Sequence, residues 1–381
     1  MPTARTEVLI VGAGPTGLTV ATALTARGIQ TTVVDRESAG ANTSRAAVVH
    51  ARTLEVLESI GVAERLVKLG IPAPRFTIRD RDRILVTVRF DNLPTRYPYT
   101  LMISQAVTEA VLRECYADFG GQVLWGRALT DLAQSDDGVI ATLEDGSKLQ
   151  ARYLVGADGM HSTVRERAGI GFPGASYEES FSLVDVRLTG SVPTDEVILY
   201  FSPAGLVVVA PLPDGVHRIV ATVDSAPERP DVEFVQSLLD ARGPERERFL
   251  VREALWGSRF RVHHRVVDTY RAGRVLLAGD AAHVHSPAGG QGMNTGIQDA
   301  IALADALATA LAGGAQELLD AYAATRRPIA VEVVALADRL TRLATVSPAV
   351  RPLRNTLLRI LSRVPSFRRE LAWRLSGLVY R

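Results

Sequence analysis

Three glycines near the N-terminus have the spacing of a turn that binds dinucleotides. Gly12, Gly14 and Gly17 form the pattern G-x-G-x-x-G between an apolar segment and a stretch that is typical of a helix. In this setting the first glycine permits a tight turn, the second lets a pyrophosphate approach the backbone, and the third allows the helix to pack closely on the strand. Asp35 lies 23 residues after Gly12, where its carboxylate could accept hydrogen bonds from ribose hydroxyls. The signature therefore predicts a nucleotide site.

Two later segments place an aspartate beside a glycine at the end of an apolar run. Asp158 and Gly159 end the run YLVGADG, and Gly279 and Asp280 end the run RVLLAGD. Ligands of open α/β sheets bind at the carboxyl ends of the strands, where a glycine allows close approach. Two such loops beyond the glycine turn predict a ligand that is longer than one nucleotide.

The elements that would position these residues follow from the apolar periodicity. Residues 7–11 are predicted as a strand, the segment up to residue 27 as a helix and residues 31–35 as a second strand, which together make a βαβ unit. Helix is expected to continue through residues 45–70, and another helix is expected over residues 232–255.

A different layer begins where Pro72 and Pro74 interrupt the helical pattern. Residues 75–90 are predicted as two strands around a charged tip, and residues 181–224 as a β-meander with Ser-Pro-Ala-Gly and Pro-Asp-Gly turns. Alanine- and leucine-rich helix follows from Thr295. The sequence thus predicts a doubly wound α/β domain that is interrupted twice by a mostly antiparallel sheet domain.

Bulk composition excludes several classes of protein. The 381 residues are 47% hydrophobic and 22% charged, which is the ordinary globular range, and the formal net charge of +1 gives no reason to expect a nucleic-acid partner. The single cysteine, Cys115, excludes an intramolecular disulfide and fits a reducing compartment. We therefore expect a cytoplasmic protein without an export signal or membrane span. The seven histidines have no metal-ligand spacing, so no metal site is expected.

The ordered motifs resemble those of the class A flavoprotein aromatic hydroxylases, single-component FAD monooxygenases that share the fold of p-hydroxybenzoate hydroxylase. The resemblance covers about residues 6–330 and includes the glycine turn, the Asp-Gly segment and the Gly-Asp segment in family order. It is closest to the hydroxylases of actinobacterial aromatic polyketides and related antibiotic-modifying enzymes. Longer members continue beyond a segment similar to LSGLVYR into a thioredoxin-like domain, which we expect this chain to lack.

The resemblance implies an α/β fold with a discontinuous Rossmann-like FAD-binding domain, an inserted, mostly antiparallel β-sheet substrate domain and C-terminal helices. The expected bounds are 1–71, 101–173 and 270–330 for the FAD-binding domain, 72–100 and 174–269 for the substrate-binding sheet domain, and 331–381 for the C-terminal helical segment.

Particular residues match positions with known roles in the family. Arg45 matches an arginine that meets the FAD pyrophosphate, Gln105 a glutamine near the ribityl chain, and Asp280 the aspartate that binds the ribityl hydroxyls. The helix that begins near Gln291 would aim its N-terminus at the N1–C2 carbonyl edge of the flavin. Asp35 stands where relatives often carry the longer glutamate. The residues expected to bind FAD are Gly12, Gly14, Pro15, Thr16, Gly17, Asp35, Arg36, Arg45, Gln105, Asp158, Gly159, Gly279, Asp280, Pro287, Gly289, Gly290, Gly292, Met293 and Asn294.

The activity implied by the resemblance is hydroxylation of an aromatic substrate. In the family, NADPH or NADH reduces FAD, O2 adds at flavin C4a, and the distal oxygen of the hydroperoxide passes to an electron-rich ring. The absence of a second glycine motif fits transient docking of the nicotinamide near the flavin. A Baeyer–Villiger oxygenase and a non-catalytic flavoprotein that sequesters an aromatic ligand are alternatives. A flavin halogenase and an ordinary NAD dehydrogenase are less well supported.

The sequence identifies no catalytic base. His217, Tyr200, Tyr97 and Tyr99 lie in or near the predicted sheet domain, and we interpret each of them as structural. A monomer or a homodimer fits the sequence equally well.

The C-terminal segment is basic, because residues 338–381 hold ten arginines against two acids. Its apolar residues follow a helical period. One face carries Leu353, Leu357, Ile360, Leu361 and Val364, and a second face, after Pro365, carries Phe367, Leu371, Leu375 and Leu378. A basic amphipathic helix can bind an anionic membrane, but we expect these faces to pack on the body of the protein.

Overall fold

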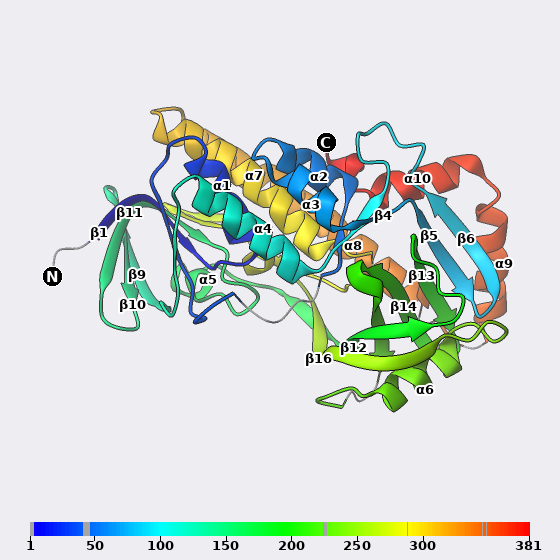
Figure 1. The fold of residues 1–381 in the computed structure, drawn as a ribbon. Helices are drawn as coiled ribbons and strands as arrows, with labels where there is room; N and C mark the ends of the chain where they lie inside the picture. The colour runs from blue at the N-terminus through cyan, green and yellow to red at the C-terminus, as the bar shows by residue number, and fades with distance from the viewer. Residues whose placement is uncertain (1–3, 41–45, 224–226, 288, 345, 348) are drawn as a thin grey trace.

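A computed structural model describes residues 4–40, 46–223, 227–287, 289–344, 346–347 and 349–381 (Figure 1). One large sheet has the strand order β17-β18-β11-β1-β2-β8, with β10 and β9 attached beside β11. β1 runs parallel to both β2 and β11, and β18 runs parallel to β11. The strands are β1 (Ala4–Val11), β2 (Thr31–Val34), β8 (Val123–Leu124), β9 (Leu129–Ser135), β10 (Gly138–Leu143), β11 (Lys148–Gly156), β17 (Arg271–Ala272) and β18 (Val275–Leu277).

Helices cover this parallel sheet and bury its central strand. Val8, Leu9 and Ile10 of β1 are all at most 1% exposed, as expected for a strand that is covered on both faces. In Figure 1 the long α7 runs beside α1, and α4 lies on the other side of α1. The helices of this part are α1 (Pro15–Thr25), α4 (Gln105–Asp118), α5 (Thr163–Arg167), α7 (Gly292–Leu311) and α8 (Glu317–Ala344).

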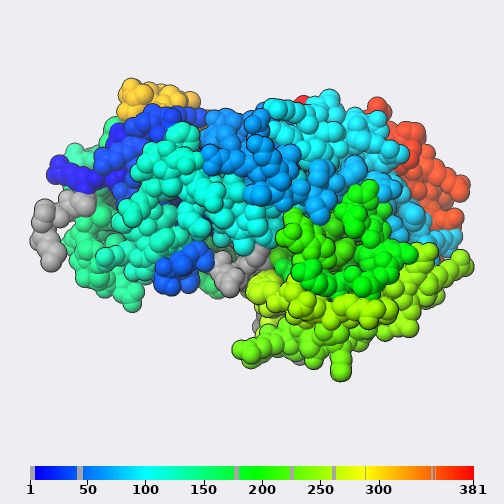
Figure 2. Space-filling model, in the orientation of Figure 1, coloured from blue at the N-terminus to red at the C-terminus, as the bar shows by residue number. Residues whose placement is uncertain are grey.

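The second large sheet is mostly antiparallel and has the order β19-β16-β12-β15-β14-β13-β5-β6. Only β5 and β13 pair in parallel within it. In the space-filling view most of this sheet forms a lobe at the lower right, together with α6 (Figure 2). Its strands are β5 (Arg75–Asp80), β6 (Arg83–Arg89), β12 (Gly174–Thr189), β13 (Glu196–Ser202), β14 (Gly205–Leu212), β15 (Val216–Val223), β16 (Leu250–Val266) and β19 (His283–Val284).

Two expectations about helices are only partly right. The segment expected as helix over residues 45–70 contains a short strand, β3 (Val48–Val49), and two separate helices, α2 (Ala51–Glu58) and α3 (Val62–Leu69). Gly61 interrupts them with a left-handed backbone at φ 72°. β3 forms a small sheet with β7 (Thr100–Met102) and β4 (Ile71–Ala73).

The helix expected over residues 232–255 ends much earlier. α6 (Val232–Arg242) stops at Gly243, which is followed by a proline, and the chain enters β16 at Leu250. A glycine at the end of a helix with a proline next to it is a strong stop signal. The apolar residues after Leu250 therefore belong to a strand.

The expectation for the C-terminal faces is half wrong. α9 (Arg351–Leu361) and α10 (Pro365–Leu375) both contact the edge strand β6. The second face does pack, because Leu375 and Leu378 are at most 3% exposed. The first face does not: Leu353, Leu357, Ile360 and Val364 are exposed. The body of the protein instead contacts the side of α9 that carries Arg354, Asn355 and Leu358.

No helix among the described residues combines the length and the apolar character that crossing a bilayer requires.

Candidate active site

A cavity of about 690 Å³ is lined by residues from both large sheets and from the loops between them. One part of its wall comes from the turns that follow β1, β2 and β11. The opposite part comes from the inner face of the antiparallel sheet, and residues 284–287 and 289–293 join the two. The cavity therefore connects the predicted nucleotide turn to the predicted substrate sheet.

The glycine turn has the geometry that its spacing predicts. Gly12 has a φ of +108°, and a Cβ there would lie 2.3 Å from the carbonyl oxygen of Ala157. A Cβ on Gly17 would lie 1.9 Å from the carbonyl oxygen of Gly12. Gly14 differs, because no atom lies within 4 Å of its added Cβ and the residue lines the cavity. Gly12 and Gly17 thus close the turn, while Gly14 leaves room for a ligand.

The first turn of α1 presents backbone N–H groups to the cavity. Its N-cap residue is Gly14, and no side chain caps the helix. Pro15 and Thr16 of the first turn line the cavity. Because uncapped N–H groups and the helix dipole favour an anion, this end of α1 suits a pyrophosphate.

Asp35 organises the turn in addition to facing the cavity. Its Oδ2 accepts a hydrogen bond from the Ala13 amide at 2.6 Å, and its Oδ1 accepts one from the Glu37 amide at 2.9 Å. Each carboxylate oxygen can still accept a second hydrogen bond. Arg36 also lines the cavity and donates to the Asp158 carbonyl oxygen at 3.2 Å.

Gln105 links the cavity to a buried acid that the sequence reasoning missed. Its Oε1 accepts a hydrogen bond from the Ala46 amide at 3.2 Å, and its Nε2 donates to Glu109 at 2.8 Å. Both side chains line the cavity. Burial raises the pKa of Glu109 above its ordinary value. Arg45, which was expected beside them, lies outside the described residues.

Asp158 supports the start of α5, where Ser162 is the N-cap residue, and Gly159 lies at the cavity wall. Its Oδ1 accepts from the Ser162 hydroxyl at 2.6 Å and its Oδ2 from the Val164 amide at 3.1 Å. Burial raises the pKa of this carboxyl. Gly159 has a φ of +79°. The aspartate therefore shapes the loop that Gly159 presents to the cavity.

Gly279 brings the end of β18 against α1. A Cβ on Gly279 would lie 2.4 Å from the Thr16 hydroxyl oxygen, and a Cβ on Gly296 would lie 2.5 Å from the same atom. The next residue, Asp280, is exposed and lines the cavity. The tight packing of small residues behind it fixes where the Asp280 carboxylate enters the cavity.

A second helix also begins at the cavity wall. α7 follows the loop of Pro287, Gly289 and Gly290, and its N-cap residue, Gln291, makes no side-chain cap. Gly292 and Met293 of its first turn line the cavity. Asn294 is fully buried behind this wall and ties the loop in place. It accepts from the His50 amide and donates to the carbonyl oxygens of Val48 and Gly290.

His50 is a second residue that the sequence reasoning missed. Its Nε2 lies 2.9 Å from the Gly289 carbonyl oxygen, and because a carbonyl only accepts, Nε2 carries the proton. Burial lowers the pKa of His50 from 6.5 to about 4, so the imidazole is neutral near pH 7. The ring lines the cavity and holds the glycine loop against it.

A buried ionic group lies behind the Gly-Asp loop. Asp299 of α7 accepts hydrogen bonds from His283 at 2.7 Å and from Arg326 of α8 at 2.6 Å. Burial alone would raise the pKa of Asp299, but the nearby Arg326 and His283 bring it below its ordinary value. These three side chains join the loop after Asp280 to both helices.

The antiparallel sheet contributes an apolar wall. Leu206, Val208 and Ala210 of β14 line the cavity, while the alternate residues Val207 and Val209 face the other way. This is the alternation of a strand with two different faces. The outer face packs on Val235, Leu238 and Leu239 of α6. The other apolar residues of the inner wall are Phe76, Phe90, Phe181, Leu183, Val197, Leu199 and Val220.

Arg218 is a buried charge on this mostly apolar inner face, whose other basic residues at the cavity are Arg75 and His263. It donates two hydrogen bonds of 2.7 Å to Asp185 and a third, of 2.8 Å, to the Ala46 carbonyl oxygen. The guanidinium side chain is 1% exposed and lines the cavity. Arg218 therefore joins the substrate sheet to the loop that also contacts Gln105.

The four residues considered as bases lie away from the cavity wall. His217 and Tyr200 are buried, and Tyr97 donates to Glu58 at 2.6 Å. Neither these three nor Tyr99 is among the described residues that line the cavity. Their interpretation as structural residues therefore fits their positions.

Most of the expected FAD-binding residues meet at this cavity. Gly17, Gly279 and Asn294 are the exceptions among the described residues, because they pack behind the wall. No group of three or more histidine, cysteine, aspartate or glutamate side chains suited to a metal ion occurs among the residues that the structure describes. The remaining expected residues on the wall are Gly12, Gly14, Pro15, Thr16, Asp35, Arg36, Gln105, Asp158, Gly159, Asp280, Pro287, Gly289, Gly290, Gly292 and Met293.

The family described as "FAD binding domain" matches residues 5–337, which is most of the chain. The chain belongs to this family. FAD is therefore its cofactor, as predicted. The sequence is 44% identical over 358 residues to a 6-methylpretetramide 4-monooxygenase of Streptomyces rimosus. That alignment covers 91% of this chain and 63% of the relative, so the chain spans less than two thirds of the relative's length.

Solved structures of FAD binding domain relatives agree with the fold. A p-nitrophenol 4-monooxygenase from Pseudomonas putida DLL-E4 superposes with a TM-score of 0.87 at 26% identity, over 99% of each chain. An anhydrotetracycline hydroxylase from Streptomyces rimosus superposes with a TM-score of 0.81 at 35% identity, over 98% of this chain and 76% of that one. The predicted fold class and the resemblance to class A FAD aromatic hydroxylases are confirmed.

Proposed function

We propose that this protein is an FAD-dependent monooxygenase that uses NADPH or NADH and O2 to hydroxylate a large, mostly apolar aromatic molecule. The observation that carries this proposal is that one continuous cavity joins a dinucleotide turn to a mostly apolar sheet face. FAD, when bound, supplies the chemistry of electron transfer and oxygen activation. The substrate class draws support from the aromatic monooxygenases among its relatives.

In this proposal the loops of the parallel sheet hold FAD. The open space at Gly14 and the uncapped start of α1 would take the pyrophosphate. Asp35 would accept a ribose hydroxyl with its remaining lone pairs, and Asp280 would accept from the ribityl chain. The start of α7 would place its N–H groups beside the flavin ring, where they favour negative charge on the reduced ring.

The inner face of the antiparallel sheet would hold the substrate beside the flavin. Leu206, Val208 and Ala210 offer a flat apolar wall that excludes water and suits an aromatic ring system. Arg218 is held by Asp185, so its charge is balanced within the protein. We further propose that the division of the chain into FAD-binding and substrate-binding segments follows the two large sheets.

An assay of the purified flavoprotein tests the proposal. NAD(P)H oxidation is measured with each member of a panel of polycyclic aromatic phenols, and the mass and structure of each product are determined. Substrate-accelerated NAD(P)H oxidation with one oxygen atom added to an aromatic carbon is the expected result. Ring expansion by the inserted oxygen would show Baeyer–Villiger chemistry instead. Stoichiometric hydrogen peroxide with every aromatic compound would contradict the proposal.

A further inference from the structure

The outer side of α9 carries a stripe of exposed apolar side chains. Leu353, Leu357 and Ile360 are 71%, 52% and 55% exposed, and Val350 and Val364 extend the stripe at each end. The intervals of three and four residues place Leu353, Leu357 and Ile360 on one side of α9, with Val350 just before the helix and Val364 between α9 and α10. Single exposed apolar residues are ordinary, but a contiguous stripe marks an interaction surface.

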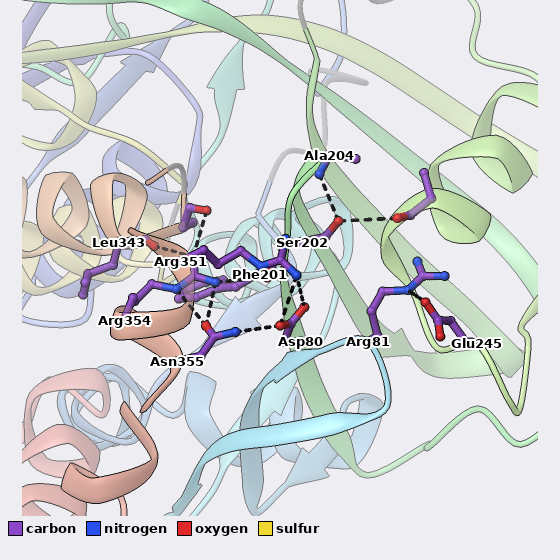
Figure 3. A network of polar contacts seen from close by, with 12 residues as sticks. Asp80, Arg81, Phe201, Ser202, Ala204, Glu245, Leu343, Arg351, Arg354 and Asn355 are labelled. Carbon is purple, nitrogen blue, oxygen red and sulfur yellow. Dashed lines mark hydrogen bonds and ion pairs between the residues drawn. The ribbon is translucent and has the colours of Figure 1, made fainter. Parts of the chain in front are cut away.

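Buried polar contacts hold α9 in this orientation (Figure 3). Arg354 donates to the carbonyl oxygens of Leu343 at 2.9 Å and Phe201 at 3.2 Å. Asn355 donates to Asp80 at 2.6 Å, and Arg351 donates to the same carboxylate at 3.2 Å. α9 therefore turns Arg354, Asn355 and one leucine, Leu358, to the protein, while its other large apolar residues lie mostly outward.

The orientation is fixed by the fold because each polar contact satisfies a buried group. Arg354 and Asn355 are at most 8% exposed, and the Arg354 guanidinium also lies 5.2 Å from the centre of the Phe201 ring. Rotating α9 to bury Leu353 and Leu357 would leave these donors and Asp80 without partners, which is costly in a protein interior. The exposed stripe is thus a stable feature of the surface.

The charges around the stripe indicate what covers it. α9 contains no acidic residue, and Arg363, Arg368 and Arg369 make no ion pair among the residues that the structure describes. All three arginines are exposed, Arg363 next to Val364 at the end of the stripe and the other two in α10. An apolar stripe beside unneutralised arginines matches the surface of a bilayer that contains anionic phospholipid.

A second copy of the chain fits this surface less well. Two α9 helices packed face to face would bring arginines together without an acid on either helix. The helix is about 16 Å long and about 10 Å wide. Such a face is far smaller than the roughly 800 Å² per partner that a stable interface buries.

We propose that the outer face of α9 is a docking site for anionic phospholipid membranes, with the leucine stripe entering the interface and the neighbouring arginines contacting headgroups. The protein would lie on the membrane and be released by salt, because its charge attraction is screened as ionic strength rises. This inference does not depend on the proposed reaction.

Vesicle flotation of the FAD-loaded full chain tests the proposal. The comparison uses vesicles of phosphatidylglycerol mixed with phosphatidylcholine and vesicles of phosphatidylcholine alone. We expect binding to the anionic vesicles at low salt, at least tenfold weaker binding at high salt, and little binding to the neutral vesicles. Leu357→Glu should weaken binding about tenfold or more, since burying a leucine contributes at least that factor. Replacing Arg363 and Arg368 by glutamine should weaken binding to the anionic vesicles only.

Leu69→Glu is the matched control, because Leu69 lies at the end of another helix, α3, and is 49% exposed. It should bind vesicles as the wild type does, and flavin absorbance should show that every variant retains FAD. Equal loss of binding in Leu69→Glu and Leu357→Glu would overturn the proposal. So would no binding to anionic vesicles, or a dimer in the absence of lipid that Leu357→Glu dissociates.

Discussion

The two ends of the cavity are lined by different kinds of chemical group. At the nucleotide end the wall is mainly backbone: glycine turns and two uncapped helix starts, at Gly14 and Gln291. At the sheet end the wall is mainly apolar side chains on alternate strand positions, such as Val208 and Leu199. A backbone site fixes one ligand tightly, whereas a side-chain wall can be changed residue by residue. The cofactor end is thus expected to tolerate few substitutions and the substrate end many.

The largest expected effect is a difference between substitutions at two glycines of the same turn. Gly17→Ala places a Cβ 1.9 Å from the Gly12 carbonyl oxygen, so the FAD-free protein should lose roughly 3 kcal/mol or more of unfolding free energy. Gly14→Ala meets no protein atom within 4 Å and has an ordinary φ of −75°. It should fold normally yet bind FAD at least about tenfold more weakly. Denaturant unfolding and FAD titration measure the two effects, and normal FAD binding by Gly14→Ala would show that the cofactor does not approach this turn.

The next effect concerns the buried ionic group of Asp299, His283 and Arg326, which lies behind the cofactor end of the cavity. Asp299→Asn removes the charge between His283 and Arg326. It should lower the unfolding free energy by about 3 kcal/mol because it leaves Arg326 buried and unpaired. Asp305→Asn on the same helix breaks an exposed ion pair with Arg27 and should cost less than about 1 kcal/mol.

The pKa of Asp299 also fixes the sign of a pH effect. Because the folded protein lowers this pKa, the stabilisation is complete above the ordinary carboxyl pKa and is lost as the pH falls below it. Unfolding of both variants between pH 3 and pH 7 should show a shallower acid dependence for Asp299→Asn alone. Equal losses of unfolding free energy in Asp299→Asn and Asp305→Asn would mean that the buried network contributes no more to stability than a surface ion pair.

His50 provides an effect that is absent at neutral pH and appears only as the pH falls. The pKa of this residue falls from 6.5 to about 4 on folding, so the unfolded chain binds more protons between these values. Stability should be complete above pH 6.5 and decline by about 3 kcal/mol as the pH falls to 4. His50→Gln, which can still donate to the Gly289 carbonyl, should flatten this decline, while a variant of the exposed His161 should follow the wild type. An unchanged pH profile in His50→Gln would contradict the burial of a neutral imidazole.

The smallest effect compares neighbouring residues of one strand. Val208→Ala enlarges the cavity and should change the KM for substrate severalfold with little change in stability. Val209→Ala opens a hole under α6 and should lower the unfolding free energy by roughly 1–2 kcal/mol with little change in KM. Steady-state kinetics and denaturant unfolding of the two variants measure both quantities. The same response from both residues would mean that the two faces of β14 are not functionally distinct.

The same contrast explains what the sequence could predict. Gly12 and Gly17 could be identified because a tight backbone approach admits only glycine there, and Gly14 because it completes the spacing of the motif. The pair Arg218–Asp185 could not, because it depends on the register between β12 and β15. An arginine within the apolar strand HRIVATVD was the one available signal.

The orientation of α9 was also beyond reach of the sequence. Its period identified an apolar face correctly, but the partner that turns this face outward, Asp80, lies 275 residues before Asn355. Local periodicity gives the face of a helix, not the surface against which the helix packs.

The central claim is that FAD and an aromatic substrate share one cavity, with the substrate on the inner face of β14. The most direct measurement titrates the FAD-loaded protein with an aromatic ligand and records the flavin difference spectrum in the wild type and in Val208→Trp. We predict that the ligand perturbs the flavin spectrum of the wild type. Val208→Trp, which fills the sheet end, should retain stoichiometric FAD and lose the perturbation. An aromatic ligand that binds Val208→Trp and perturbs its flavin as in the wild type would contradict the claim.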